Sequence, residues 1–212
     1  GQIEGIESRL ESIVNDYQRT KISAEAYYLL GKIHISDKWD LEKAKEYFEM
    51  VPKESSRSIF SPMAKNYSKS ISQYQEAIRD IQYLNSQNIN IVDDNSIGEI
   101  DTTKLSVSKT SAPLKTLPEL YYQIADLEAF SFHRDKNAIN ILNQIIIDYP
   151  ESIFKPKAIF SLSFIYRTLE QDSLATSAEN KLLREFPDTE YASYLSKDSK
   201  SSSSIQKNLI MK

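Results

Sequence analysis

Calcium coordination is the first chemistry suggested by a residue spacing in this chain. Asp93, Asn95 and Gly98 hold the first, third and sixth places of a calcium-binding loop. Such a loop also needs an oxygen ligand at its fifth place and a bidentate carboxylate at its twelfth. The chain has Ile97 and Lys104 at those places. The spacing therefore favours a solvated turn over a calcium site.

The chain contains two histidines, His34 and His133, and no cysteine. Glu128 lies five residues before His133, and this separation does not place both side chains on one face of a helix. Neither histidine therefore has a second ligand at a metal-binding spacing. The lack of cysteine excludes disulfides, thiolate metal sites and cysteine nucleophiles. We expect no metal and no cofactor.

Acid-base, nucleophilic and nucleotide chemistry also lack the residues that they require. Acidic pairs such as Asp37 and Asp40 are better explained as turn and helix-capping residues. No serine stands in the context of a nucleophile elbow. The chain has 4 glycines, which are too widely spaced to build a phosphate-binding loop. We therefore expect the protein not to be an enzyme.

The overall charge argues against nucleic acid as a partner. Lys and Arg number 26 against 30 Asp and Glu, so the formal net charge is −4, and no basic excess is present to neutralise phosphates. No apolar run approaches the ~18 residues that a membrane-spanning helix needs, so we expect no membrane insertion by this chain. The N-terminus shows no charged-then-apolar export signal and begins inside a helical pattern. We expect the chain to be a piece of a longer protein.

A short phrase recurs between apolar stretches and predicts where helices end and begin. It reads DYPESIF at 148–154, with echoes in DYQRTKI at 16–22 and EFPDTEY at 185–191. The apolar residues before 148–154 recur at spacings of three and four, which predicts a helix that Pro150 ends. Ser152 can then cap the next helix. The residues at the equivalent capping place are Thr20, Ser58 and Thr189.

Small residues between these phrases predict pairs of closely packed helices. Two antiparallel helices joined by a short turn approach closely only where side chains are small. The small residue of the first helix is Gly31, Ala125 or Ser163, and that of the second is Ala44, Ala138 or Ala175. The last pair has one residue fewer in its turn than the other two. The expected N-caps of the second helices are Asp40, Asp135 and Asp172.

These residues resemble the tetratricopeptide repeat, a helix-turn-helix unit of about 34 residues. The sequences YPES and FPDT, the second followed by Tyr191 and Ala192, resemble those of the bacterial envelope branch of this repeat family. That branch includes the outer-membrane assembly lipoprotein BamD and the Tol-Pal associated periplasmic repeat protein. The resemblance covers about residues 3–57 and 117–195. It implies an all-α, right-handed solenoid with a long inserted loop. It also implies a periplasmic or cell-envelope location, with the cytoplasm as the alternative.

Four segments are expected along the chain. Residues 1–85 hold a truncated repeat, one full repeat and a long capping helix, for which a coiled coil is the alternative. Residues 86–116 form a linker or inserted loop, although its isoleucines could support short strands. Residues 117–195 hold the C-terminal repeats. Residues 196–212 form a disordered Ser/Lys tail.

In the family that these residues resemble, partner segments bind the concave face made by the first helices. Position relative to the small residues therefore gives a set of candidate groove residues. The candidates are Tyr28, Lys32, Tyr122, Asp126, Phe160, Phe164 and Arg167, and the same faces carry Glu25, Ile35, Glu119, Phe130 and Lys157. Aromatic anchors beside single charges suit a peptide groove. The alternative is that Tyr28, Tyr122 and Phe160 only pack between neighbouring repeats.

Two functions follow from this sequence. The first is a non-catalytic scaffold of a bacterial cell envelope that binds other proteins or extended peptides. The alternative is a cytoplasmic adaptor or a self-associating structural module built on the same repeats.

Overall fold

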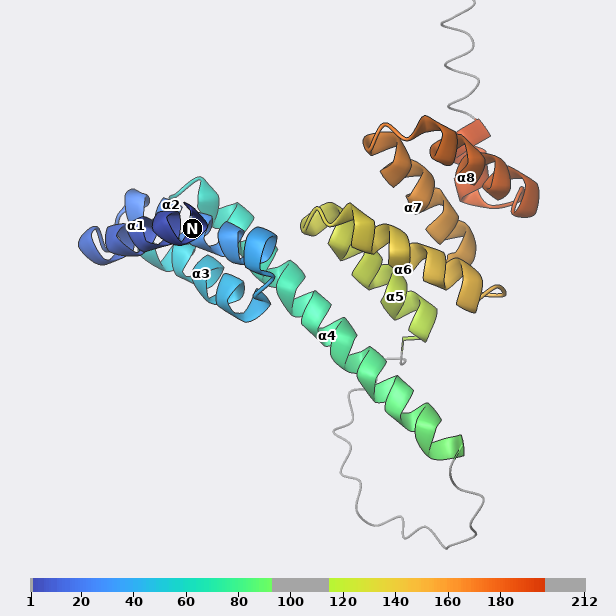
Figure 1. Cartoon of the computed structure of the whole chain (residues 1–212), viewed down its shortest axis with the longest axis horizontal. Helices are drawn as coiled ribbons and strands as arrows, with labels where there is room; N and C mark the ends of the chain where they lie inside the picture. The colour runs from blue at the N-terminus through green and yellow to red at the C-terminus, as the bar shows by residue number, and fades with distance from the viewer. Residues whose placement is uncertain (1, 93–114, 197–212) are drawn as a thin grey trace, which may run out of the picture. The chain divides into compact units, whose positions relative to one another are not determined.

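The computed structural model describes residues 2–92 and 115–196, and every regular element within those ranges is a helix (Figure 1). The predicted all-α fold class is therefore confirmed for the described part of the chain. Residues 93–114, which include the calcium-like spacing and most of the expected loop, lie outside it, and so do residues 197–212.

Two compact units make up the chain. Within the described residues, one comprises 2–78 with 130–133, and the other comprises 79–92, 115–129 and 134–196. The elements of the first are α1 (Gln2–Asp16), α2 (Lys21–Ile33), η1 (His34–Lys38), α3 (Leu41–Glu54) and the start of α4 (Phe60–Val92). In this unit α1 packs on α2, and α2 packs on α3 (Figure 1).

The helix pair of the first unit is close because Gly31 has no side chain. A Cβ atom at Gly31 would lie 2.7 Å from Cε1 of Phe48, which projects from α3 and is fully buried. Ala44 is likewise fully buried on the same helix. The small residues that the sequence singled out therefore lie where these two helices meet. On α1, Leu10 and Val14 form a cluster with Ala26 and Leu30 of α2.

A π-helical turn accommodates the extra residue in two of the helix pairs. The first helix of each ends in such a turn, η1 after α2 and η2 (Leu127–Ser131) after α5 (Leu117–Asp126). A π-turn is a one-residue insertion into a helix, and it leaves the small residues of the pair in register. In all three helix pairs, including the last, which has no π-turn, a residue between the two helices has a left-handed backbone, with φ of 51° at Trp39, 58° at His133 and 59° at Glu170.

Helix capping follows the recurring phrase. The Ser23 amide donates to Thr20 Oγ1 at 3.1 Å, and the amides of Phe60 and Phe154 donate to Ser58 and Ser152. Thr189 Oγ1 accepts from the Ala192 amide at 3.3 Å. Thr20 and Thr189 therefore cap helices in the predicted way. Ser58 and Ser152 instead accept from the amide two residues on, and the N-cap of α7 is Ile153, which makes no side-chain capping bond.

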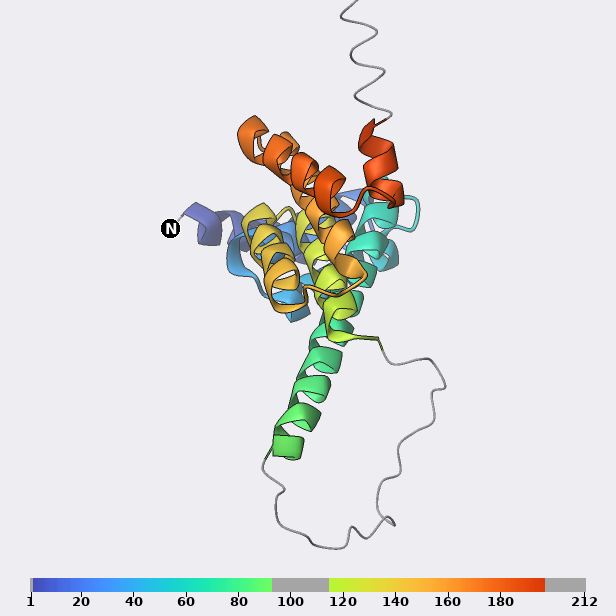
Figure 2. The same ribbon diagram turned by 90° about the vertical axis from the view of Figure 1, so that its right-hand side faces the viewer.

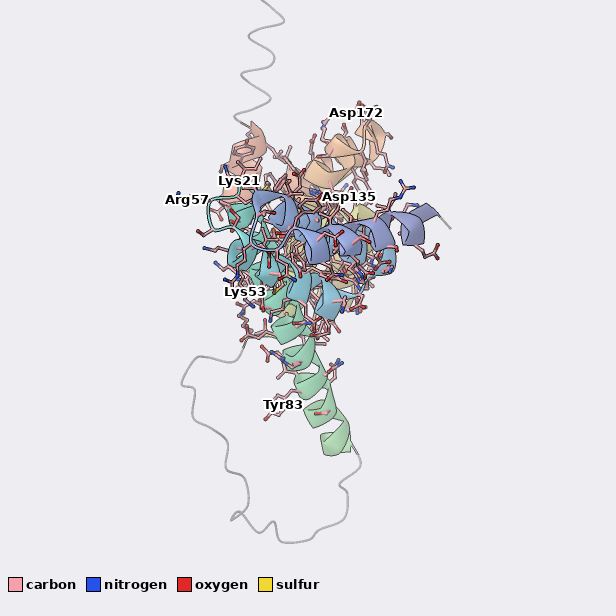
Figure 3. All side chains as sticks on the ribbon, turned by 90° about the vertical axis from the view of Figure 1, so that its left-hand side faces the viewer. Lys21, Lys53, Arg57, Tyr83, Asp135 and Asp172 are labelled. Carbon is pink, nitrogen blue, oxygen red and sulfur yellow. The ribbon has the colours of Figure 1, made fainter. Side chains whose placement is uncertain are left out.

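The acidic caps expected on the second helices are found in only one of three pairs. Asp40 caps α3 by accepting from the Lys43 amide at 3.0 Å. Asp135 and Asp172, labelled in Figure 3, are instead the first residues inside α6 (Asp135–Asp148) and α8 (Asp172–Glu185). A carboxylate in the first turn still interacts favourably with the positive end of the helix dipole, so acidic residues recur there without capping.

Helix α4 is longer than the sequence predicts. It spans Phe60–Val92 and so includes residues 86–92, for which the sequence predicts a loop. Its first turns pack on the helix pair, with the Phe60 ring stacked on Tyr28 at 4.8 Å and the Tyr67 ring on Phe48 at 4.9 Å. No glycine or proline interrupts residues 64–92, which removes the usual signal for an earlier end.

The second unit stacks its helices in sequence order (Figures 1 and 2). In this unit α5 packs on α6, α6 on α7 (Phe154–Thr168), α7 on α8, and α5 also contacts α7. A further helical segment covers residues 190–196. The core common to α5, α6 and α7 contains Ala125, Ala138, Leu142, Ile145, Ala158, Leu162 and Ile165. Each first helix therefore lies beside the next, and both contribute side chains to one surface.

Candidate protein-binding face

The second unit carries a row of aromatic and charged side chains on its first helices, which we call the aromatic face. It consists of Tyr122 and Asp126 on α5, Lys157, Phe160 and Phe164 on α7, and Tyr191 and Tyr194 in residues 190–196. The spacings of three and four residues place the members on each helix on one side of it.

Tyr122 joins α5 to α7. Its hydroxyl lies 2.9 Å from Ser161 Oγ, and its ring centroid lies 6.0 Å from that of Phe154. Burial raises the pKa of Tyr122, an effect that the hydrogen bond with Ser161 opposes. The half-buried ring therefore joins two neighbouring first helices, in agreement with the packing alternative given for this residue. Its role in binding stays a prediction.

A pair of opposite charges lies beside the Tyr122 ring. Lys157 Nζ is 4.3 Å from the ring centroid, the geometry of a cation–π contact. Asp126 lies one helical turn after Tyr122 on α5. Loss of water around its carboxylate raises the pKa of Asp126, and the positive charge of Lys157 lowers it. The aromatic face therefore carries one negative charge, Asp126, and one positive charge, Lys157, beside its rings.

The far end of the face is aromatic and open. The ring of Phe160 lies 5.4 Å from that of Tyr191 and meets Tyr194 edge-on at 5.8 Å. Phe164, one turn further along α7, is 54% exposed, and Tyr194 is 58% exposed. Phe160 is thus partly used in packing, whereas Phe164 and Tyr194 present most of their surface outward.

Arg167 behaves differently from the other candidates on α7. Its guanidinium donates three hydrogen bonds to the Glu179 carboxylate, at 2.9 and 3.0 Å from Nη2 and at 3.1 Å from Nε, and one to Asp172 at 3.0 Å. These carboxylates, Glu179 first, raise the pKa of Arg167. The long side chain reaches α8 because two acidic residues lie within its range. It is therefore engaged within its own helix pair.

The remaining candidates, Tyr28 and Lys32, come together in the first unit. The Tyr28 ring lies among those of Phe48, Phe60 and Tyr67, and burial raises the pKa of Tyr28. Lys32 Nζ donates to the Tyr67 hydroxyl at 2.9 Å and lies 4.7 Å from its ring centroid. The seven predicted residues thus form two groups, one in each unit.

Sequence reasoning missed the contribution of residues 190–196. Tyr191 and Tyr194 complete the aromatic face, yet no candidate was chosen after Arg167. The signal was present, because EFPDTEY is the phrase that begins a helix elsewhere in the chain. Tyr67 of α4 was missed in the same way, since this helix was interpreted only as a cap.

Groups that could support other chemistry are engaged in the structure. The buried His34 bonds through Nε2 to Glu7 at 2.8 Å, and the buried Glu128 pairs with Arg134 at 3.4 Å. Within residues 2–92 and 115–196, no three His, Asp or Glu side chains gather at metal-binding distances. The described helices include none that combines the length and the apolar character needed to span a bilayer.

Comparison of this chain with protein families, with curated proteins and with solved structures finds no match.

Proposed function

We propose that this protein is a non-catalytic scaffold that binds other proteins or extended peptide segments on the aromatic face. The carrying observation is the outward presentation of Phe164 and Tyr194 on first helices that lie side by side. Bulky aromatic side chains that stay exposed on a folded domain contribute little to its stability and more often belong to an interaction site. Adjacent opposite charges at Asp126 and Lys157 would fix the register of a bound segment.

The proposed architecture is a right-handed tetratricopeptide-like solenoid with a long inserted loop. Helix pairs that close on small residues, with a left-handed residue at each corner, support this proposal. The wording of the phrases at 148–154 and 185–191 supports a place in a bacterial cell envelope, in outer-membrane assembly or a Tol-Pal type complex. Cell fractionation with an antibody against the native protein tests this location against the cytoplasmic alternative.

A self-associating structural module is the second candidate. Exposed aliphatic side chains at Ile59, Ile147 and Ile153, which are 78%, 74% and 84% exposed, favour it. Sedimentation equilibrium of the purified chain separates the two candidates. A monomer at all concentrations favours the adaptor or scaffold, and a concentration-dependent dimer favours self-association.

The direct test is partner capture by a face variant and a matched control. Phe164→Ala with Tyr194→Ala removes two exposed aromatics from the aromatic face. Tyr17→Ala with Tyr83→Ala removes two of similar exposure elsewhere (52% and 51%; Tyr83 is labelled in Figure 3). Proteins captured from native cells by the wild type and the control should be lost by the face variant, with circular dichroism unchanged. Equal capture by all three proteins would refute the aromatic face as the binding surface.

A further inference from the structure

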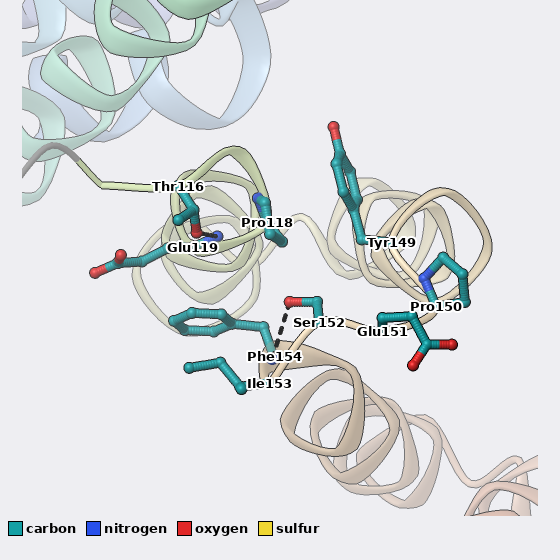
Figure 4. A pocket seen from close by; sticks show the side chains of 9 residues that line it. All are labelled: Thr116, Pro118, Glu119, Tyr149, Pro150, Glu151, Ser152, Ile153 and Phe154. Atoms are coloured by element: carbon teal, nitrogen blue, oxygen red, sulfur yellow. Dashed lines mark hydrogen bonds between the residues drawn. The ribbon is translucent and has the colours of Figure 1, made fainter.

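A separate apolar pocket lies on the second unit, between the start of α5 and the turn that leads into α7 (Figure 4). Its volume is about 480 Å³. Its lining residues are Thr116, Pro118, Glu119, Tyr149, Pro150, Glu151, Ser152, Ile153 and Phe154. The aromatic face contributes none of them.

The walls of the pocket are apolar, and its two ends are acidic. The rings of Pro118, Tyr149 and Phe154 surround the opening, and Ile153 at its edge is 84% exposed. Figure 4 shows the Glu119 and Glu151 side chains at opposite ends, each directed away from the apolar floor.

The basic residues near the pocket do not neutralise these carboxylates. Lys115 Nζ donates to the Gln123 side chain at 2.7 Å, and Lys155 Nζ lies 3.9 Å from Glu185. Within the described residues, Glu119 and Glu151 take part in no ion pair. The rim of the pocket therefore keeps two negative charges available to a ligand.

At the equivalent turns of two other helix pairs, charged side chains make contacts across the turn. Before α4, the Glu54 carboxylate accepts hydrogen bonds from the Ser23 hydroxyl, at 2.7 Å, and from the Arg19 amide. At the turn after α8, Lys155 Nζ lies 5.4 Å from the centroid of the Phe186 ring and also faces Glu185. The turn at 149–154 has the same recurring phrase, but no charged contact of this kind crosses it among the described residues.

We propose that this pocket binds a segment of a partner protein that carries one or two bulky apolar side chains flanked by lysine or arginine. The apolar floor takes the bulky side chain, and Glu119 and Glu151 pair with the flanking cations at either end. A symmetric second copy of this chain is a poorer occupant, because it would bring like carboxylates together. A small molecule is poorer as well, because no polar group on the floor would orient it.

The test uses the whole chain and three synthetic peptides with a fluorescein label. The first has the sequence Gly-Lys-Lys-Leu-Leu-Lys-Lys-Gly, the second has glutamate in place of lysine, and the third has serine in place of leucine. Fluorescence anisotropy measures the affinities, and amide NMR shifts locate the binding. We expect only the first peptide to bind, with shifts at residues 116–119 and 149–154, and we expect its affinity to fall as salt is added.

Two variants and a matched control test the residues. Glu119→Gln with Glu151→Gln should weaken peptide binding by about 3- to 10-fold, because each exposed charge at the rim contributes only a small part of the binding free energy. Ile153→Ser should weaken it by about 10-fold because a contact of the apolar rim is lost. Ile147→Ser, which removes an isoleucine of similar exposure outside the pocket, should leave the affinity unchanged. Circular dichroism checks that all of the variants fold.

Four outcomes would overturn the inference. They are a failure of the first peptide to bind, equal binding of the glutamate peptide, NMR shifts confined to the aromatic face, and a dimer that Ile153→Ser abolishes. The third of these would leave the proposed function standing while excluding this pocket. Loss of partner capture by the face variant alone, with peptide binding intact, would confirm that the two surfaces are independent.

Discussion

Replacing Gly31 by alanine tests the close crossing of α2 and α3. The added Cβ would lie 2.7 Å from Cε1 and 2.8 Å from Cδ1 of Phe48, closer than carbon atoms normally approach. The Phe48 ring has little room to move, because it is fully buried and stacks on Tyr67 with an interplanar angle of 11°. The helices must therefore separate, or the stacked rings must shift.

Two opposing effects set the size of the change. Alanine is favoured over glycine inside a helix by about 1 kcal/mol. Overpacking of a well-filled core typically costs about 1–3 kcal/mol. We expect the overpacking to exceed the gain, because Phe48 is fully buried and stacked on Tyr67, and Gly31→Ala should lose about 1–2 kcal/mol of unfolding free energy. Urea unfolding followed by the fluorescence of Trp39, the single tryptophan, reports on this unit.

Gly5 supplies a matched control on α1. A Cβ at Gly5 meets no other atom within 4 Å, so Gly5→Ala should stabilise the same unit by about 0.5–1 kcal/mol. Adding Phe48→Leu should cost less in the Gly31→Ala background than in the wild type, because the clash is then relieved. If Gly31→Ala stabilises the protein as Gly5→Ala does, the crossing is not as close as described.

Two further changes test the second unit and the charges of the first. Ala138→Leu should lower the urea midpoint by the equivalent of about 1–3 kcal/mol, because Ala138 is fully buried where α5, α6 and α7 meet; an unchanged midpoint would show that the site has room for a larger side chain. Hydrogen bonds from Lys38 and His34 lower the pKa of Glu7, so their stabilisation is fully present above the usual glutamate pKa and is lost as the pH falls through the lowered one. Glu7→Gln should lower the free energy of unfolding by about 1 kcal/mol at neutral pH. Urea midpoints of the wild type and the variant, measured over a pH series, should converge in acid. A difference that stays constant with pH would mean that Glu7 acts through packing alone.

The sequence by itself predicted the elements of this protein because their signals are local. Apolar residues at three and four spacing define one buried face per helix. Thr20 and Thr189 cap helices at the places that the recurring phrase assigns them, since a cap needs only its neighbouring amides. Ser58 and Ser152 bond at the same places to the amide two residues on. The same local rules predicted the small residues at helix crossings.

The conformation of the turns and the extent of α4 could not be predicted in this way. One extra residue between two small positions is compatible with a longer loop or with a π-turn, and only packing of the helix pair chooses between them. Helix α4 continues through residues 86–92, where the alternating Ile89 and Ile91 are equally compatible with a short strand.

Tertiary structure alone decided the roles of the candidate site residues. Periodicity put Phe160, Phe164 and Arg167 on one face of α7, but Arg167 turns to the carboxylates of α8, and Phe160 packs against Tyr191. Phe164, one turn further along the same helix, keeps 54% of its surface exposed. Helical spacing fixes the direction in which a side chain leaves its helix. Its environment depends on segments distant in sequence, whose positions follow from the packing of the whole unit.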